Sequence, residues 1–383
     1  MTESISIRQM DLAEQGQVRA LFKRCLGPID LIAFSIVFTD IVKSIKKQQG
    51  CCLIALQGNV VVGTMSLRTF TYGQQGVGLV DAVATDTTVR GKGIAKLMLA
   101  KAIGWFEVRG YPDVYATVDR YNSPSWNMFL HAGFTPYGLS RQVRDFGGRF
   151  LKLWADEGFL FGFGTFFLKR RGGSPVPSPD AKAEPRDPPG ALHVLAACAG
   201  YALLWAIILF RGGVTALDTY LAAMIVASLS VVLPELGHKA VARALGLRTC
   251  FKAWPSGFWF MLALGLVGGL YPAYGSTYIV QLDWSYTKMR KETGRVFVAG
   301  PVVNVLVAIS CQALSIALGS GTWHVVLAMG FTMNTWLAMF NILPVKSAGG
   351  MPFDGYKIYA WNKVAWTGLA TCIVVLFVLG FLT

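Results

Sequence analysis

The sequence has few acidic residues, few histidines and no paired cysteine motif. Asp and Glu number 21 against 35 Lys and Arg, which leaves a net charge of +14. The seven cysteines include no CxxC pair and form an odd total, which excludes a full disulfide framework and a zinc-ribbon spacing. The four histidines fall in separate parts of the chain. Residues 1–8 hold no apolar core, so no signal peptide is visible and the first domain is expected to stay in the cytoplasm.

The positive charge points to an anionic membrane surface rather than to nucleic acid, because many of the Lys and Arg residues flank apolar segments. Hydrophobic residues make up 54% of the chain and the mean hydropathy is +0.48, which is too high for a soluble protein. The first part has the composition of an ordinary soluble domain, so the apolar excess lies in the second part. The sequence therefore predicts a soluble domain joined to a membrane domain.

A glycine-bearing stretch, Val89-Arg90-Gly91-Lys92-Gly93-Ile94-Ala95, connects an apolar run at 78–84 to a helical pattern at 94–109. A loop that enters a helix in this way directs successive backbone N–H groups at one point, and the helix dipole adds positive potential there. Glycines let an anion come close to the backbone. The stretch predicts a polyphosphate site, although a plain Gly-rich turn gives the same pattern.

This stretch resembles the coenzyme A loop of the GNAT superfamily of N-acetyltransferases, Arg/Gln-x-x-Gly-x-Gly/Ala. The resemblance covers residues 4–154, with strands expected at 4–10, 51–56, 60–67, 78–84 and 114–118. It implies an α/β domain at residues 1–157 with a mixed, mostly antiparallel sheet and flanking helices. It also implies that acetyl-CoA is bound by Val83, Arg90, Gly91, Lys92, Gly93, Ile94, Ala95 and Asn122. Asn before Ser-Pro is equally an ordinary helix cap.

Acetyl transfer to an amine requires a base near the thioester carbonyl. The family often places an acidic residue on the strand before the loop, and Asp81 matches that position. Strict alternation puts Leu79, Asp81 and Val83 on one face of the strand. If that face lines the cleft, Asp81 is the base; if the face is solvated, Asp81 is a surface charge. The family's frequent acid, a Tyr, corresponds here to Phe129, with Tyr121 and Tyr137 as candidate substitutes.

Residues 158–190 separate the two domains. Residues 158–171 are rich in Phe and end in Lys169-Arg170-Arg171, which suits an aromatic and basic juxtamembrane segment; a final strand of the acetyltransferase sheet fits nearly as well. Residues 172–190 are rich in Pro, Gly and charge, and they are predicted to be a linker.

Apolar runs predict an all-α polytopic membrane domain at residues 191–383. Candidate spans are 191–210, 219–233, 296–318, 322–343 and 364–382, whereas 256–271 is shorter and lies between two prolines. If 256–271 re-enters, every basic loop, including those with Lys288 and Lys346, falls on the cytoplasmic side. Five spans plus a re-entrant hairpin are therefore favoured over six spans, in a multi-pass protein of the cell membrane with a cytoplasmic N-terminal domain.

Three motifs place polar residues in the membrane half. In Leu233-Pro234-Glu235-Leu236-Gly237-His238, Glu235 and His238 share a helix face at i, i+3, and Pro234 shares it with His238 at i, i+4. Ionisable residues inside a membrane are costly and indicate a functional site. The other motifs are Ala299-Gly300-Pro301-Val302-Val303-Asn304 and Asn341-Ile342-Leu343-Pro344, which leads to Asp354-Gly355.

Together these motifs resemble the site-2 protease family of intramembrane zinc metalloproteases over residues 219–363. In that family a His-Glu-x-x-His helix and a distant Asp supply three zinc ligands, and the Glu activates water. The resemblance implies Glu235 as the protease base, and His238 and Asp354 as metal ligands. Pro234 replaces the first His and has no donor atom, so zinc is a doubtful cofactor. The prediction is a protease-like fold without hydrolysis, in which the three polar residues hydrogen-bond one another.

Three functions follow from these features. The first is a membrane-anchored N-acetyltransferase that acts on an amine of a protein or small molecule at the cytoplasmic face, with a membrane-protein partner in the protease-like groove. The second is an acetyl-CoA-sensing membrane module without catalysis, which is favoured by Phe129 at the position of the family's frequent acid. The third is an acetyl-CoA-regulated intramembrane zinc metalloprotease, which Pro234 disfavours. The sequence favours the first and predicts no nucleic-acid partner.

Overall fold

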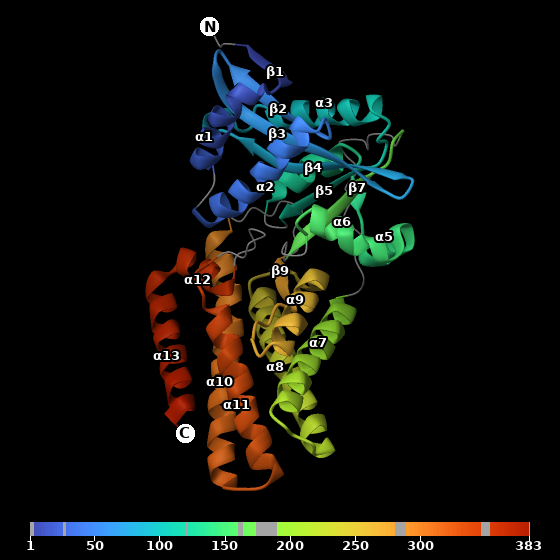
Figure 1. Cartoon of the computed structure of the whole chain (residues 1–383). Helices are drawn as coiled ribbons and strands as arrows, with labels where there is room; N and C mark the ends of the chain where they lie inside the picture. The colour runs from blue at the N-terminus through green and yellow to red at the C-terminus, as the bar shows by residue number, and fades with distance from the viewer. Residues whose placement is uncertain are drawn as a thin grey trace. The chain divides into compact units, whose positions relative to one another are not determined.

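The computed structural model describes residues 4–25, 28–119, 122–159, 164–173, 190–279, 289–345 and 353–382. The chain divides into two compact units, residues 1–186 and 187–383 (Figure 1). Most of the predicted linker at 172–190 lies outside the described residues, as do Tyr121, Lys288 and Lys346.

The first unit is a seven-stranded sheet with helices on both faces. Its elements are β1 (Ile5–Gln9), η1 (Leu12–Glu14), α1 (Gln15–Cys25), α2 (Pro28–Lys46), β2 (Gly50–Gln57), β3 (Val60–Tyr72), β4 (Gln75–Thr85), η2 (Thr87–Val89), α3 (Ile94–Val108), β5 (Val114–Asp119), α4 (Ser123–His131), β6 (Thr135–Pro136), α5 (Leu139–Phe146), η3 (Gly147–Arg149), α6 (Phe150–Asp156) and β7 (Thr165–Arg170). The strands lie in the order β1-β2-β3-β4-β5-β7-β6, and among the described strands only β4 and β5 pair in parallel. This is the mixed, mostly antiparallel sheet that the sequence predicted.

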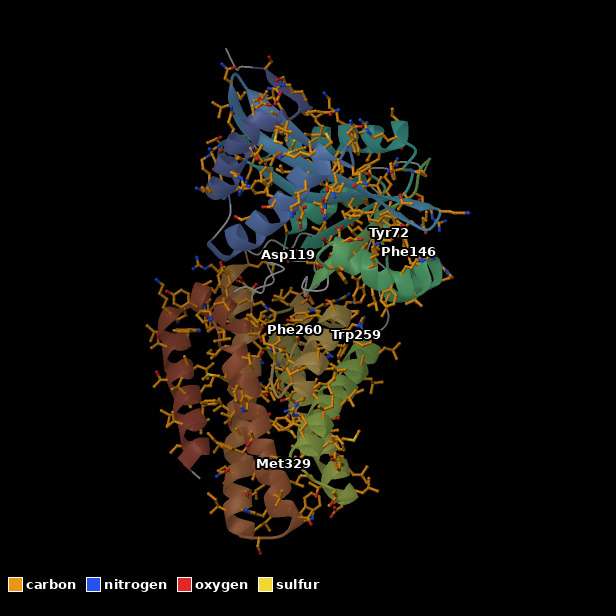
Figure 2. All side chains as sticks on the ribbon, viewed as in Figure 1. Tyr72, Asp119, Phe146, Trp259, Phe260 and Met329 are labelled. Atoms are coloured by element: carbon orange, nitrogen blue, oxygen red, sulfur yellow. The ribbon has the colours of Figure 1, made fainter. Side chains whose placement is uncertain are left out.

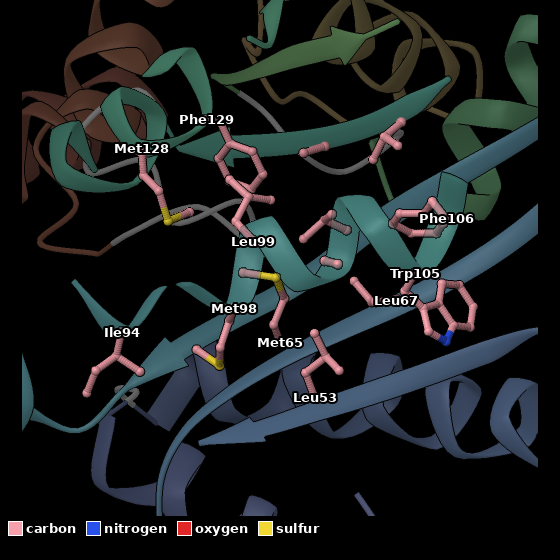
Figure 3. Packing of buried hydrophobic residues seen from close by; sticks show 14 of the residues in the cluster. Leu53, Met65, Leu67, Ile94, Met98, Leu99, Trp105, Phe106, Met128 and Phe129 are labelled. Carbon is pink, nitrogen blue, oxygen red and sulfur yellow. The ribbon is translucent and has the colours of Figure 1, made fainter. Parts of the chain in front are cut away.

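Helices cover both faces of this sheet, so the central strands β2, β3 and β4 have residues buried on both sides. Along β2, Cys51 and Leu53 pack with α3, whereas Cys52 and Ile54 pack with α1 and α2 on the opposite face. Helices α5 and α6 extend that second layer over β3, β4, β5 and β7. Figure 3 shows the first layer, in which α3 lies along β3 and its buried side chains point at the sheet.

The first unit continues beyond residue 157, where the sequence placed the end of the acetyltransferase domain. Strand β7 pairs antiparallel with β5 and with β6, inside the sheet. Lys169 and Arg170 are each 7% exposed within this unit, and Lys169 Nζ lies 2.8 Å from the carboxylate of Asp113. The juxtamembrane interpretation is therefore wrong for Thr165–Arg170, and the final-strand alternative is correct, because the Phe side chains of this strand complete the core.

The described residues of the second unit form helices and one small sheet. Its elements are α7 (Gly190–Arg211), α8 (Leu217–Ala244), β8 (Thr249–Ala253), α9 (Pro255–Leu266), β9 (Gly275–Ile279), α10 (Arg290–Leu318), α11 (Thr322–Asn341), α12 (Asp354–Trp361) and α13 (Lys363–Leu382). Strands β8 and β9 are five residues each and pair antiparallel, a pairing that was not predicted from the sequence.

Four helices in the described part of this unit are long and apolar enough to cross a membrane: α7, α8, α10 and α13. The remaining predicted span, at 322–343, forms the 20-residue helix α11. Helix α9 has 12 residues. At 1.5 Å per residue it covers about 18 Å, which is short of the roughly 30 Å of hydrocarbon in a bilayer. This length suits a re-entrant segment; the number of spans stays a prediction.

Candidate functional site

The predicted coenzyme A loop connects β4 to α3 through two glycines in the left-handed region. Gly91 has φ 82° and Gly93 has φ 77°, a conformation that costs a residue with a Cβ about 1–2 kcal/mol. No described atom lies within 4 Å of the place where a Cβ would stand on either glycine, so the requirement comes from the backbone alone. The loop exposes Arg90, Gly91 and Lys92, half-buries Gly93 and Ala95, and buries Ile94.

Helix α3 begins without a side-chain cap. Its N-cap residue is Gly93, which has no side chain to accept from the first-turn N–H groups. These groups have no partner within a helix and are satisfied by caps, water or ligands. The Nε of Arg90 donates to the carbonyl of Thr85 at 3.2 Å, and Lys92 is exposed beside the loop. The arrangement offers backbone donors and positive potential to an anion.

Strands β4 and β5 separate in the middle of the sheet. Their parallel pairing ends at Val80 and Ala116, although both strands continue beyond these residues. β4 bulges at the same point, because Val80 and Ala82 pair with consecutive residues of β3 and Asp81 is the extra residue between them. Bulges of this kind occur next to active sites, where they re-aim a side chain.

The bulge corrects the predicted face of β4. Strict alternation placed Leu79, Asp81 and Val83 together, but Val83 packs with the α3 layer while Leu79 packs with the opposite layer. Because a bulge adds one residue to the strand, every side chain beyond it changes face. Asp81 therefore does not share a face with Val83, whose contact with coenzyme A stays a prediction.

Asp81 is held by a buried guanidinium. Arg68 Nε donates to one carboxylate oxygen of Asp81 at 2.6 Å, and Arg68 Nη2 donates to the other. Arg68 is 9% exposed and also donates to the carbonyl of Asp156 at 2.7 Å. The charge of Asp81 is thus already balanced by a bidentate partner. This pairing weighs against Asp81 as the base, and the role stays a prediction.

A second carboxylate, which sequence reasoning missed, lies in the same region. Glu157 is the C-cap residue of α6, and both oxygens of its carboxylate are buried. Burial raises the pKa of Glu157 well above its ordinary range, and the negative charge of Asp81 raises it further. No sequence pattern indicated Glu157 as a site residue. It lies outside the predicted coenzyme A loop and comes near Asp81 only when the chain is folded.

The remaining predicted residues of the first unit have structural partners. The side chain of Asn122 accepts from the N–H of Ser125 at 3.3 Å and caps α4, so its contact with coenzyme A stays a prediction. Phe129 is 2% exposed and lies in the core beside α3 (Figure 3). Tyr137, a candidate substitute acid, donates to Asp145 at 2.8 Å.

In the second unit, Glu235, His238 and Asp354 line one cavity of about 60 Å³. Pro234 lines the same cavity, one helical turn before His238 on α8, and Asp354 begins α12. Gly355 allows α12 to reach this position, because a Cβ there would lie 1.9 Å from the carbonyl oxygen of Ile342. The Asn341–Pro344 motif therefore forms the corner against which α12 packs.

His238 is oriented from both sides of its ring. Its Nδ1 lies 3.0 Å from the carbonyl oxygen of Val296, and its Nε2 lies 3.4 Å from a carboxylate oxygen of Asp354. Gly300 of α10 makes room for the ring, since a Cβ there would lie 2.4 Å from Nε2. The glycine of the second motif thus permits close approach of α8 and α10 at the histidine.

Glu235 has different partners. One carboxylate oxygen accepts from the hydroxyl of Thr277 on β9, and the other lies 3.5 Å from Lys239 Nζ. Within the described residues, the predicted internal cluster is therefore divided: His238 faces Asp354, while Glu235 is bound by the small sheet and by the next turn of α8.

The described residues do not fit a catalytic zinc ion. They contain no group of three His, Cys, Asp or Glu side chains placed to hold a metal, whereas catalytic zinc takes three protein ligands. A cation of the protein already balances Asp354: the fully buried Lys357 places its Nζ 3.1 Å from the carboxylate and 3.5 Å from the ring centroid of Phe297. That Pro234 takes the place of the first ligand of the site-2 protease motif stays a prediction.

Known proteins match the chain in two ways. The acetyltransferase (GNAT) family matches residues 17–134. A protein of Methanocaldococcus jannaschii named "Putative zinc metalloprotease MJ0611" is 32% identical over 149 residues, which cover 38% of this chain and 73% of that protein.

Two solved structures with similarity to this chain are acetyltransferases. The NatC complex bound to Gag peptide and CoA has 16% identity and a TM-score of 0.32, covering 44% of this chain and 98% of the other. The PaiA N-acetyltransferase of Thermoplasma acidophilum, in complex with coenzyme A, has 14% identity and a TM-score of 0.33, covering 44% and 99%. The family match shows that the chain contains a GNAT acetyltransferase domain. The similarity to the archaeal relative shows that the chain also belongs to the family of this M. jannaschii protein, which is named as a putative zinc metalloprotease.

Proposed function

We propose that this chain is a membrane-anchored N-acetyltransferase that transfers the acetyl group of acetyl-CoA to an amine at the cytoplasmic face. The observation that carries the proposal is the uncapped N-terminus of α3 behind Gly91 and Gly93, in a domain of the GNAT family. Such a terminus offers several backbone donors to one diphosphate group.

The residues of the loop would hold the diphosphate, with Arg90 and Lys92 adding charge at its edge. From Thr85 back to Asp81, β4 covers about 13 Å at 3.3 Å per residue, a length that an extended pantetheine arm can follow. The arm would then bring the thioester to the point where β4 leaves β5. The separated strand edges supply N–H and C=O groups for the amides of the arm and for the carbonyl oxygen.

The rate would come chiefly from positioning and from hydrogen bonds to the developing oxyanion. Phe129 occupies the place of the family's frequent Tyr and lies buried in the core, so it offers no hydroxyl to the leaving thiolate. The same observation favours the second candidate, an acetyl-CoA-sensing membrane module that binds the thioester without transferring its acetyl group.

The second unit would anchor the enzyme as a multi-pass protein of the cell membrane, with the first unit in the cytoplasm. Its cavity would receive part of a membrane-protein partner rather than hydrolyse it, because Pro234 leaves the metal site incomplete. The name of the archaeal relative supports the third candidate, a zinc metalloprotease regulated by acetyl-CoA. The ligand set of the described residues argues against it.

The test is label transfer from acetyl-CoA by the purified full-length chain to cytoplasmic extract. Gly93→Asp places a carboxylate at the diphosphate site and should abolish transfer. The matched control is Gly104→Asp, which adds the same charge on α3 far from the loop, where no described atom lies within 4 Å of a Cβ. Transfer that survives Gly93→Asp would contradict the proposal, and tight binding without any transfer would favour sensing.

A further inference from the structure

A buried carboxylate lies at the point where β4 and β5 separate. Among the described residues, neither oxygen of Glu157 has a hydrogen-bond partner of regular geometry, and both oxygens are buried. Buried charged groups in proteins are ordinarily paired or hydrogen-bonded, because an isolated one is costly. Thr117 and Arg68 offset part of this cost, but burial and the charge of Asp81 outweigh them.

The position of Glu157 is set by contacts of its neighbours. Asp156 receives a hydrogen bond on its backbone carbonyl from Arg68 at 2.7 Å and one on its side chain from the hydroxyl of Tyr72, also at 2.7 Å. The ring of Tyr72 packs edge-on against Phe146 of α5, with 5.8 Å between centroids (Figure 2). Strand β3 thus fixes the end of α6, which is the precondition for a group that must meet a substrate in one place.

The surrounding charges leave one negative charge in excess. Arg68 brings one positive charge, while Asp81 and Glu157 bring two negative charges. Asp40 of α2 adds further negative potential at Asp81, and Thr117 of β5 faces the carboxylate of Glu157 as a polar neighbour. Arg68 also acts on Glu157, but its guanidinium is bound by Asp81, so a cation beside Glu157 would balance the remaining charge when Glu157 is ionised.

The environment also suits proton transfer. Burial, and then the charge of Asp81, raise the pKa of Glu157 well above its ordinary range, with Arg68 and Thr117 acting in the opposite direction. A carboxylate whose pKa is raised is a stronger base than an ordinary one. Burial raises the pKa of Asp81 as well, but its two carboxylate oxygens are occupied by N–H groups of Arg68, whereas those of Glu157 are not.

We infer that Glu157 is the catalytic residue that takes the proton from the acceptor, and that the acceptor is an amine that arrives as an ammonium ion. The inference rests on the proposed acetyl transfer and names its base and substrate class. The carboxylate of Glu157 removes one proton from the ammonium, and the free amine forms a C–N bond with the thioester carbon. The C–S bond then breaks, the thiolate takes the second proton from nitrogen to become free coenzyme A, and Glu157 passes its proton to water.

The experiment uses the full-length chain, with the variants Glu157→Gln and Asp156→Asn. The second variant is the matched control, since it converts the adjacent carboxylate to an amide that can still accept from Tyr72. The probes are tetra-alanine with a free amino terminus, lysine methyl ester and spermidine, with N-acetylated tetra-alanine as the blocked probe. Coenzyme A affinity and kcat/KM against pH are measured for each chain.

We expect Glu157→Gln to lower kcat/KM by about 10²–10⁴-fold, the range for loss of a general base, while coenzyme A affinity stays the same. The rate of the unaltered chain should rise with pH through one ionisation that Glu157→Gln removes and Asp156→Asn keeps. A rate that survives Glu157→Gln, an ionisation that persists in it, or failure of every cationic probe in a chain that binds coenzyme A would overturn the inference. A folded chain that binds no coenzyme A would instead overturn the proposed function itself.

Discussion

Replacing Pro234 by histidine should give the second unit a zinc site. Pro234 lines the cavity together with His238 and Asp354, so a histidine there would complete a His-His-Asp ligand set. His238 Nε2 and the nearer Asp354 oxygen already stand 3.4 Å apart. Two ligands that each lie about 2.0–2.2 Å from a tetrahedral ion have nearly this separation, so little rearrangement is needed.

The expected gain in stability has two parts. Proline inside a helix costs about 3 kcal/mol, part of which neighbouring helices relieve in a membrane, so Pro234→His should recover some stability without metal. Zinc bound only by the folded chain adds about 2.7 kcal/mol when its free concentration is 100 times the dissociation constant. The thermal unfolding temperature of Pro234→His should therefore rise with zinc, whereas that of the unaltered chain should not.

The assay is metal content by mass spectrometry, together with thermal unfolding, on purified full-length protein. Pro234→His should hold one zinc per chain and lose it when His238→Ala is added. Pro301→His is the matched control, because Pro301 also lies inside a helix but does not line the cavity. The reasoning would be refuted by a natural chain that already holds one zinc, lost in His238→Ala, or by a Pro234→His chain that holds none.

Three further outcomes are expected. Gly355→Ala should lower the unfolding temperature, because the added Cβ would lie 1.9 Å from the carbonyl oxygen of Ile342. Gly368→Ala is the control and should not lower it, since no described atom lies within 4 Å of its Cβ. Equal effects of the two changes would contradict the close packing of α12 at Gly355. Lys357→Met leaves its buried carboxylate partner without a counter-charge, which costs about 3–5 kcal/mol, and an unchanged unfolding temperature would refute that ion pair. Glu157→Gln should stabilise the first unit more at about pH 8 than at about pH 5. A carboxyl whose pKa is raised by folding makes the natural chain less stable as pH rises, and the amide removes this effect. Hydrogen exchange of β4 measures the stability difference between the two chains, and a difference that does not change with pH would contradict the prediction.

Local pattern predicted much of the first unit. The loop at 89–95 could be recognised because positive-φ glycines and a helix start are encoded within a few residues, and the structure gives Gly91 and Gly93 that conformation. The face of β4 on which Val83 lies could not be predicted, because the bulge at Asp81 shifts the alternation of side chains and cannot be recognised from the residue types. Glu157 was missed for a related reason: its approach to Asp81 depends on helices inserted between β6 and β7.

In the second unit, motif spacing predicted which side chains lie together only where they belong to the same helix. Glu235 and His238 could be placed together from α8 alone, but the bond from Thr277 depends on a small sheet that the sequence did not reveal. Lys357 could have been found, since it follows Asp354 at i, i+3 on one helix. Its burial could not be predicted, because the apolar surroundings come from another helix, through Phe297.

The most direct measurement is equilibrium binding of coenzyme A to the folded full-length chain. We predict one saturable site, lost in Gly93→Asp and kept in Gly104→Asp, because only the first change places a negative charge at the start of α3. A folded chain that leaves coenzyme A unbound at about 1 mM, or a Gly93→Asp chain that binds it as tightly as the unaltered protein, would contradict the account.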